Sequence, residues 1–114
     1  MPTARTPAVA LANIATLFST PKIKKGKVTS IKIDNQSAAA KTIYLRDDFT
    51  PDVSVKVTAP VAQTVAKFQA TVGAGLTADI METELKNKEF LGDCKCYASV
   101  ADAACIIIVD YSLE

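Results

Sequence analysis

The sequence predicts an all-β fold, an antiparallel β-sandwich or jelly-roll-like domain with an apolar N-terminal arm. Two observations lead to this prediction. Apolar and polar residues alternate with a period of two in nearly every run after Lys25, as strands with one buried face require. Apolar stripes with the 3.6-residue period of packed helices do not recur. A chain of 114 residues can build one hydrophobic core, which we place in residues 27–114, after an arm and basic linker in residues 1–26.

The first two predicted strands are residues 28–34 and 41–47. Each puts two aliphatic side chains on one face: Ile31 and Ile33 in the first strand, Ile43 and Leu45 in the second. The residues between the strands include Asn and Ser, which favour turns. We therefore expect the two strands to pair as a hairpin.

The middle of the chain predicts a loop and several weaker elements. Residues 47–52 form the loop, because Pro51 cannot donate to a strand ladder and aspartates favour turns. The elements that follow are strands over residues 53–58, 63–72 and 76–80 and a polar helical turn over residues 82–88. The helical turn is too short and too polar to pack as a helix, so we expect a connection there.

The clearest hairpin is predicted from residues 94–100 and 105–111. The second of these strands is β-branched through its middle, which is typical of a strand covered on both faces. With residues 101–104 as the loop, Val100 lies opposite Cys105, and Cys96 lies opposite Val109. One face then gathers the predicted core side chains Cys94, Cys96, Ala98, Val100, Cys105, Ile107, Val109 and Tyr111.

The cysteines Cys94, Cys96 and Cys105 are interpreted as unpaired, buried core residues. A zinc site normally uses four ligands with a wider cysteine spacing and often histidine, and this chain contains no histidine. In the predicted register Cys96 and Cys105 are separated by ~13 Å along the ladder, which exceeds the reach of a disulfide. We therefore expect neither a metal ion nor a disulfide.

The residue inventory favours a protein that is not an enzyme, with no catalytic residues and no cofactor. The chain has no histidine, no glycine-rich phosphate loop and no serine in a nucleophile elbow. Asp47, Asp48 and Asp52 match no calcium-loop spacing, and turn formation explains them better. Thirteen basic and twelve acidic side chains give a net charge of +1. This balance disfavours nucleic acid and membrane surfaces as partners, and no small-molecule substrate is expected.

The arm supplies the predicted interface, formed by Val9, Leu11, Ile14, Leu17 and Phe18. Burying a side chain of this type is worth about 1.5–3 kcal/mol, so the arm either covers its own sandwich or docks on another chain. Because prolines bracket the arm and a basic linker follows it, we expect docking on a neighbour, as a helix or as an extended strap. A secretion signal is disfavoured, since Asn13 interrupts the apolar run. No segment approaches the ~20 apolar residues of a membrane span.

The order of features from Lys27 onward resembles small virion proteins that tailed bacteriophages encode near the major capsid protein. The residues that carry this resemblance are 31–35 (IKIDN), 42–50 (TIYLRDDFT), 72–75 (VGAG), 90–92 (FLG) and 109–114 (VDYSLE). The resemblance implies a decoration or cement protein, often a homotrimer, on the outer capsid surface of a virion assembled in the host cytoplasm. Its implied partners are the major capsid protein and copies of itself.

Two other classes of protein remain as alternatives. A subunit of an extracellular filament donates an N-terminal segment as a strand to the next subunit. Donor strands alternate, however, whereas residues 8–18 are apolar at nearly every position. A small carbohydrate-binding sandwich module displays exposed aromatic rings. This chain has no Trp, and its plausible exposed rings are Tyr44 and Tyr97.

Overall fold

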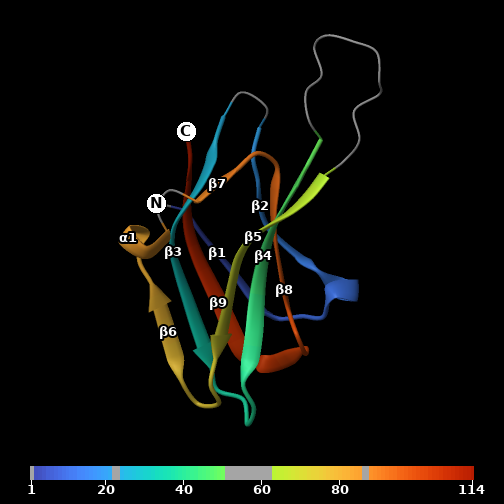
Figure 1. Ribbon diagram of the computed structural model, residues 1–114, viewed down its shortest axis with the longest axis vertical. Helices are drawn as coiled ribbons and strands as arrows, with labels where there is room; N and C mark the ends of the chain where they lie inside the picture. The colour runs from blue at the N-terminus through green and yellow to red at the C-terminus, as the bar shows by residue number, and fades with distance from the viewer. Residues whose placement is uncertain (1, 22–23, 51–62, 86–87) are drawn as a thin grey trace.

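Two antiparallel β-sheets pack face to face in the computed structural model, which describes residues 2–21, 24–50, 63–85 and 88–114 (Figure 1). Sheet A contains, in spatial order, β1 (Thr3–Ala8), β9 (Asp102–Leu113), β3 (Gly26–Asn35) and β6 (Thr77–Ile80), and β7 (Lys88–Phe90) also pairs with β3. Sheet B contains β2 (Ala15–Ser19), β8 (Asp93–Ala98), β4 (Lys41–Phe49) and β5 (Gln63–Val72). The predicted all-β antiparallel sandwich is confirmed.

The helical content of the described residues is small. A 3-10 turn, η1 (Leu11–Asn13), links β1 to β2, and the helix α1 (Glu82–Leu85) follows β6. Leu85 from α1 is buried against the core at 2% exposure, so this short connection still contributes one packed side chain. The strand predicted over residues 53–58 lies outside the described residues.

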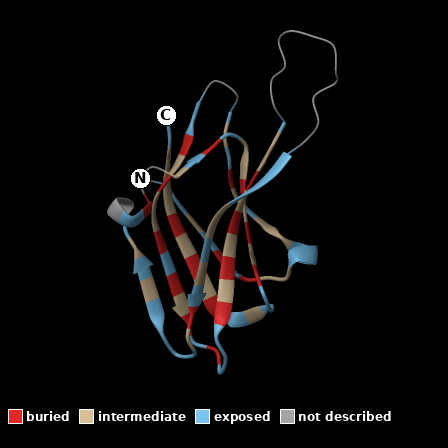
Figure 2. Ribbon diagram, viewed as in Figure 1, coloured by how far each residue is buried: buried red, intermediate tan, exposed pale blue. Residues whose placement is uncertain are grey.

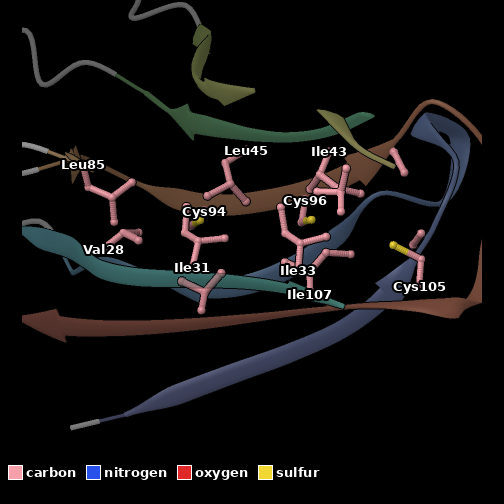
Figure 3. Close-up of a cluster of buried hydrophobic side chains, with 14 of the residues drawn as sticks. Val28, Ile31, Ile33, Ile43, Leu45, Leu85, Cys94, Cys96, Cys105 and Ile107 are labelled. Atoms are coloured by element: carbon pink, nitrogen blue, oxygen red, sulfur yellow. The ribbon is translucent and has the colours of Figure 1, made fainter. Parts of the chain in front are cut away.

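The core lies between the sheets and is built from alternate residues of each strand. The side chains that are at most 1% exposed include Ile31, Ile33, Ile107 and Val109 from sheet A and Ile43, Leu45, Cys94 and Cys96 from sheet B. Figure 2 shows buried and half-buried bands alternating along β3, β4 and β9. In Figure 3 the side chains from the two sheets point toward one another across the core. The inward faces predicted for residues 28–34 and 41–47 are therefore confirmed.

Both predicted hairpins are wrong in their pairing. β3 and β4 lie in different sheets, and so do β8 and β9, so the members of each pair face one another across the core. Cys96 lies opposite Leu45 and not opposite Val109, and Val100 lies in the connection after β8 with 57% of its surface exposed. The physical reason is that two strands with one apolar face each can bury those faces either side by side or as opposing layers ~10 Å apart.

The N-terminal segment is part of the sandwich. β1 forms the edge of sheet A beside β9, and β2 forms the edge of sheet B beside β8. Pro7 fits in β1 because an edge strand leaves one side of its backbone without a ladder partner. We expected an arm outside the domain, and for the described residues 2–21 this expectation is wrong. Backbone pairing with both sheets holds these residues in the sandwich.

One end of the sandwich is held by a buried amide. Asn35 is fully buried, and its Nδ2 atom donates to the carbonyl oxygens of Val72 at 2.9 Å, Ala39 at 3.0 Å and Gly73 at 3.2 Å. Its Oδ1 atom accepts hydrogen bonds from the backbone and the hydroxyl of Ser37. Asn35 therefore ties the connection after β3 to the turn after β5, across the two sheets.

A buried carboxylate holds the opposite end. The predicted loop over residues 47–52 begins later than expected, because β4 continues to Phe49. Asp47 is fully buried within this strand and accepts hydrogen bonds from the backbone N–H groups of Leu91 at 2.8 Å and Gly92 at 3.0 Å. A Cβ atom at Gly92 would collide with the backbone of β4, so glycine is required for this close approach.

Candidate interaction surface

The five predicted interface residues do not form one surface. Phe18 is buried in the core, where its ring stacks on Tyr111 at 4.3 Å and meets the edge of Phe90 at 5.6 Å. Leu17 is half-buried against the core, and Val9 and Ile14 are half-buried as well. Leu11 alone of the five is exposed, at 53%. The apolar character that suggested docking on a neighbour is largely satisfied within the chain.

The cysteines have the environment of inert core residues. Cys94, Cys96 and Cys105 are buried and unpaired, as predicted. Burial raises the pKa of the Cys94 thiol above its usual range and, together with the nearby Cys105, raises the pKa of Cys96 to about 12. Burial also raises the pKa of Cys105. Because the thiolate is the reactive form, these thiols are poor nucleophiles and poor metal ligands. Among the residues that the structure describes, no three His, Cys, Asp or Glu residues group as a metal site.

The outer face of sheet B is covered by interactions among its own side chains. Arg46 binds Asp48 through two hydrogen bonds, from Nε to Oδ1 at 2.6 Å and from Nη2 to Oδ2 at 2.8 Å. Lys95 Nζ lies 3.3 Å from the same carboxylate. The hydrogen bonds from Arg46 lower the pKa of Asp48, and the same contact raises the pKa of Arg46. Asp48 is therefore an ionised, paired group rather than a free acid or base.

The two tyrosines of sheet B also bind each other. The rings of Tyr44 and Tyr97 stack with centroids 4.7 Å apart and planes 14° apart. They come from directly opposite positions on β4 and β8. A sugar-binding platform presents a free aromatic face to its ligand. Here each ring uses one of its faces to stack on the other ring.

A shallow depression of about 440 Å³ lies at the end of β4 and β5, lined by Asp48, Phe49, Thr64, Leu91 and Lys95 among others. Its charged side chains are Asp48, Asp93 and Lys95, of which Asp48 and Lys95 already bind each other on sheet B. At the other end of the sandwich the buried Lys41 ammonium lies 3.8 Å from Asp102. Among the described residues at these two places, no hydrogen bond joins a threonine hydroxyl to a carboxylate that could activate it.

The outer face of sheet A differs because apolar side chains lie at its centre. β9 is an interior strand of this sheet, and its residues Ile106 and Ile108 point away from the core and are half-buried. Ile108 lies between Arg5 on β1 and Lys32 on β3, and Ile106 lies between Pro7 and Asp34. We call these six residues the sheet A patch. The β-branched run of β9 indicated cover on both faces; among the described residues, sheet B covers the inner face, and Ile106 and Ile108 on the outer face are half-buried.

A carboxylate on the same outer face joins the strands next to this patch. Asp110 accepts hydrogen bonds from the hydroxyls of Thr3 on β1 and Ser30 on β3, each at 2.7 Å. These hydrogen bonds lower the pKa of Asp110, so the group is ionised at neutral pH. β1, β9 and β3 are thus joined side by side through side chains as well as through the backbone. These contacts hold the three strands in register next to the patch.

Comparison of the chain with protein-family models, with curated proteins and with solved structures finds no match. Within the part of the chain that the structure describes, no helix has the length and apolarity needed to cross a membrane.

Proposed function

We propose that the protein is a non-enzymatic structural protein that acts while bound to a larger protein assembly. The observation that carries this proposal is the sheet A patch, where Ile106 and Ile108 lie on the outer face of an interior strand. A contiguous apolar patch with a polar rim on a sandwich face is typical of a protein–protein contact. Its six residues are two isoleucines, one proline and three charged side chains, a composition that suits binding.

The assembly we propose is the outer surface of a tailed-bacteriophage capsid, with the major capsid protein and copies of this chain as partners. The support is the resemblance of the sequence from Lys27 onward to capsid decoration proteins, together with the sandwich fold. The net charge of +1 supplies no long-range field for nucleic acid. The virion surface is the corresponding location.

The alternative classes have less support. β1 and β2 are already paired within the chain's own sheets, so a filament subunit would first have to release them before donating a strand. The stacked Tyr44 and Tyr97 rings offer little flat aromatic surface to a sugar.

The test is binding to shells assembled from a tailed-bacteriophage major capsid protein encoded in the same genome as this chain. We expect the wild-type protein to sediment with the shells. The double substitution Ile106→Lys with Ile108→Lys should lower the bound amount at least about tenfold, because it removes the apolar anchors that join copies of the chain, and joined copies hold to the shell at two points. The matched control is Gln69→Lys, an exposed position on the outer face of sheet B. Wild-type protein that stays in the supernatant would reject the proposal.

A further inference from the structure

We propose that the sheet A patch pairs two copies of this chain face to face about a two-fold axis. The inference rests on the proposed function in that it names the partner of the same patch. A second copy is the occupant that the arrangement of charges favours, as the register of the strands shows.

The patch is organised in two rows that cross the sheet. One row contains Arg5, Ile108 and Lys32 and continues to Asp79 on β6. The next row contains Pro7, Ile106 and Asp34 and continues to Thr77. The rows are two residues apart along each strand, or ~7 Å. Each row therefore has one isoleucine from β9 beside one charged residue from β3, and the two charges are opposite in sign.

Consider a two-fold axis that lies in the plane of the interface, between the two rows and perpendicular to the strands. This axis sets each row of one copy against the other row of its partner. Ile106 then faces the partner's Ile108, and Lys32 faces the partner's Asp34. Arg5 faces the partner's Pro7 on the edge strand β1, where the Arg5 side chain is exposed. Each contact occurs twice because the interface is isologous. Stacked sheets lie ~10 Å apart with interdigitating side chains, which is close enough for both kinds of contact.

Other two-fold arrangements of the same face are less favourable. An axis along β9 would set Arg5 against the partner's Lys32, which are like charges. An axis between β9 and β3 would set Ile108 against the partner's Lys32 and Ile106 against the partner's Asp34. Like-charge contacts and buried unpaired charges both oppose association. The positions of the charges thus select the axis perpendicular to the strands.

The side chains of Asp34 and Lys32 are both placed to make this contact. Its Oδ1 atom accepts hydrogen bonds from Gln36 Nε2 at 2.5 Å and from Thr77 Oγ1 at 3.1 Å, and both donors are neutral. Lys32 is exposed, so its ammonium can reach a facing chain. The net charge of +1 per copy adds little repulsion between two copies.

The experiment is a charge exchange, measured by sedimentation equilibrium over a series of protein concentrations. Wild-type protein should reach the mass of a dimer. Lys32→Asp and Asp34→Lys should each weaken association at least about tenfold, because each places like charges at both symmetric contacts. An equal mixture of the two variants should restore the dimer, since each variant then faces an opposite charge on the other. The double variant K32D/D34K should also dimerise.

Two further variants serve as controls. Lys67→Asp on β5 of sheet B makes the same change of net charge away from the patch and should leave the dimer intact. Ile108→Lys should dissociate the dimer and should not be rescued by mixing with either charge variant. Thermal melting of each variant confirms that loss of association is not loss of fold.

Several results would overturn the inference. A wild-type monomer at every concentration, a trimer as the resemblance implies, or a mixture of K32D and D34K that stays monomeric would each do so. Shell binding separates this inference from the proposed function. Patch-dependent binding to shells by a monomer would leave the function standing and remove the dimer, whereas a dimer that ignores shells would do the reverse.

Discussion

Isoleucines lie on both faces of β9, and the two faces of sheet A differ in what covers them. Ile107 points into the core and has no exposed surface, whereas Ile106 and Ile108 point outward and are half-buried. The inner side chains meet sheet B, and the outer ones lie beside residues of β1 and β3 on sheet A. The difference indicates that one strand serves two purposes, with the inner face stabilising the fold and the outer face available for association.

The largest expected effect comes from truncating the same residue type on each face. Ile107→Ala should lower the free energy of unfolding by about 3 kcal/mol, because it leaves a cavity in a packed core. Ile108→Ala should cost less than about 1 kcal/mol in the monomer. Urea unfolding at protein concentrations below the dimer midpoint measures both. Equal costs would show that the two faces do not differ as described.

The inner face has one polar side chain whose loss should cost nearly as much. Asn35→Ala leaves three carbonyl oxygens and Ser37 without their buried partner. We expect a loss of about 2–3 kcal/mol, the range for an unsatisfied buried polar group. Gln36→Ala, at the exposed neighbouring position, should stay within about 0.5 kcal/mol of the wild type. A mild N35A variant would mean that water replaces the amide.

The buried thiols on the inner face predict that the free energy of unfolding falls at alkaline pH. Burial raises the folded-state pKa values of Cys94 and Cys96 above the ~8.5 of an unfolded chain. The folded protein therefore keeps protons that the unfolded chain loses. The contribution of the protonated thiols to the free energy of unfolding is fully present below about pH 8.5. It is lost as the pH rises towards the folded pKa of about 12 for Cys96. Over this pH range the free energy of unfolding falls by up to about 1.4 kcal/mol per pH unit for each thiol.

Urea unfolding between neutral and alkaline pH tests this sensitivity. The variant with Cys94→Ala and Cys96→Ala is less stable at neutral pH, but its stability should fall less steeply with rising pH. Parallel profiles for the variant and the wild type would contradict the role of the thiols. The native protein should also react slowly with a thiol reagent that labels it fully after denaturation.

The smallest expected effect is the change in stability at low pH that comes from Asp110 on the outer face of sheet A. Hydrogen bonds from Thr3 and Ser30 lower the pKa of Asp110 in the folded state, so its contribution is present above the ordinary pKa of about 3.9. That contribution is lost as the pH falls through the lowered folded pKa. Asp110→Asn should cost less than about 1 kcal/mol at neutral pH and flatten the acid limb. Ser30→Ala, which removes one donor, should move the acid transition to higher pH by a smaller amount.

The sequence predicts which side chains point inward but not which strands are neighbours. Alternation placed Ile31, Ile33, Ile43 and Leu45 correctly, because burial of one face has the same period in any sheet. Pairing depends on how the connections turn. The residues after β3 lead the chain across the core, held there by Asn35, and nothing in local alternation distinguishes that route from a hairpin.

The N-terminal segment and the sheet A patch were missed for related reasons. The apolar run over residues 8–18 contains the end of one edge strand, a 3-10 turn and another edge strand with an irregular register, so it shows no single period. The patch combines residues from β1, β3 and β9, which are distant in sequence. One local signal for it was present, since a β-branched run without polar alternation indicates cover on both faces.

The pairing of β1 with β9 has a consequence for how the chain folds. The hydrogen-bonded residues Thr3 and Asp110 are 107 positions apart, so β1 leaves the ribosome about a hundred residues before the strand it needs. Contacts this distant in sequence form slowly, because a long loop must close before any pairing is gained. Until β9 arrives, β1 has no partner in its sheet. β1 can therefore complete its pairing only after β9 is synthesised, so the last step of folding follows synthesis of β9.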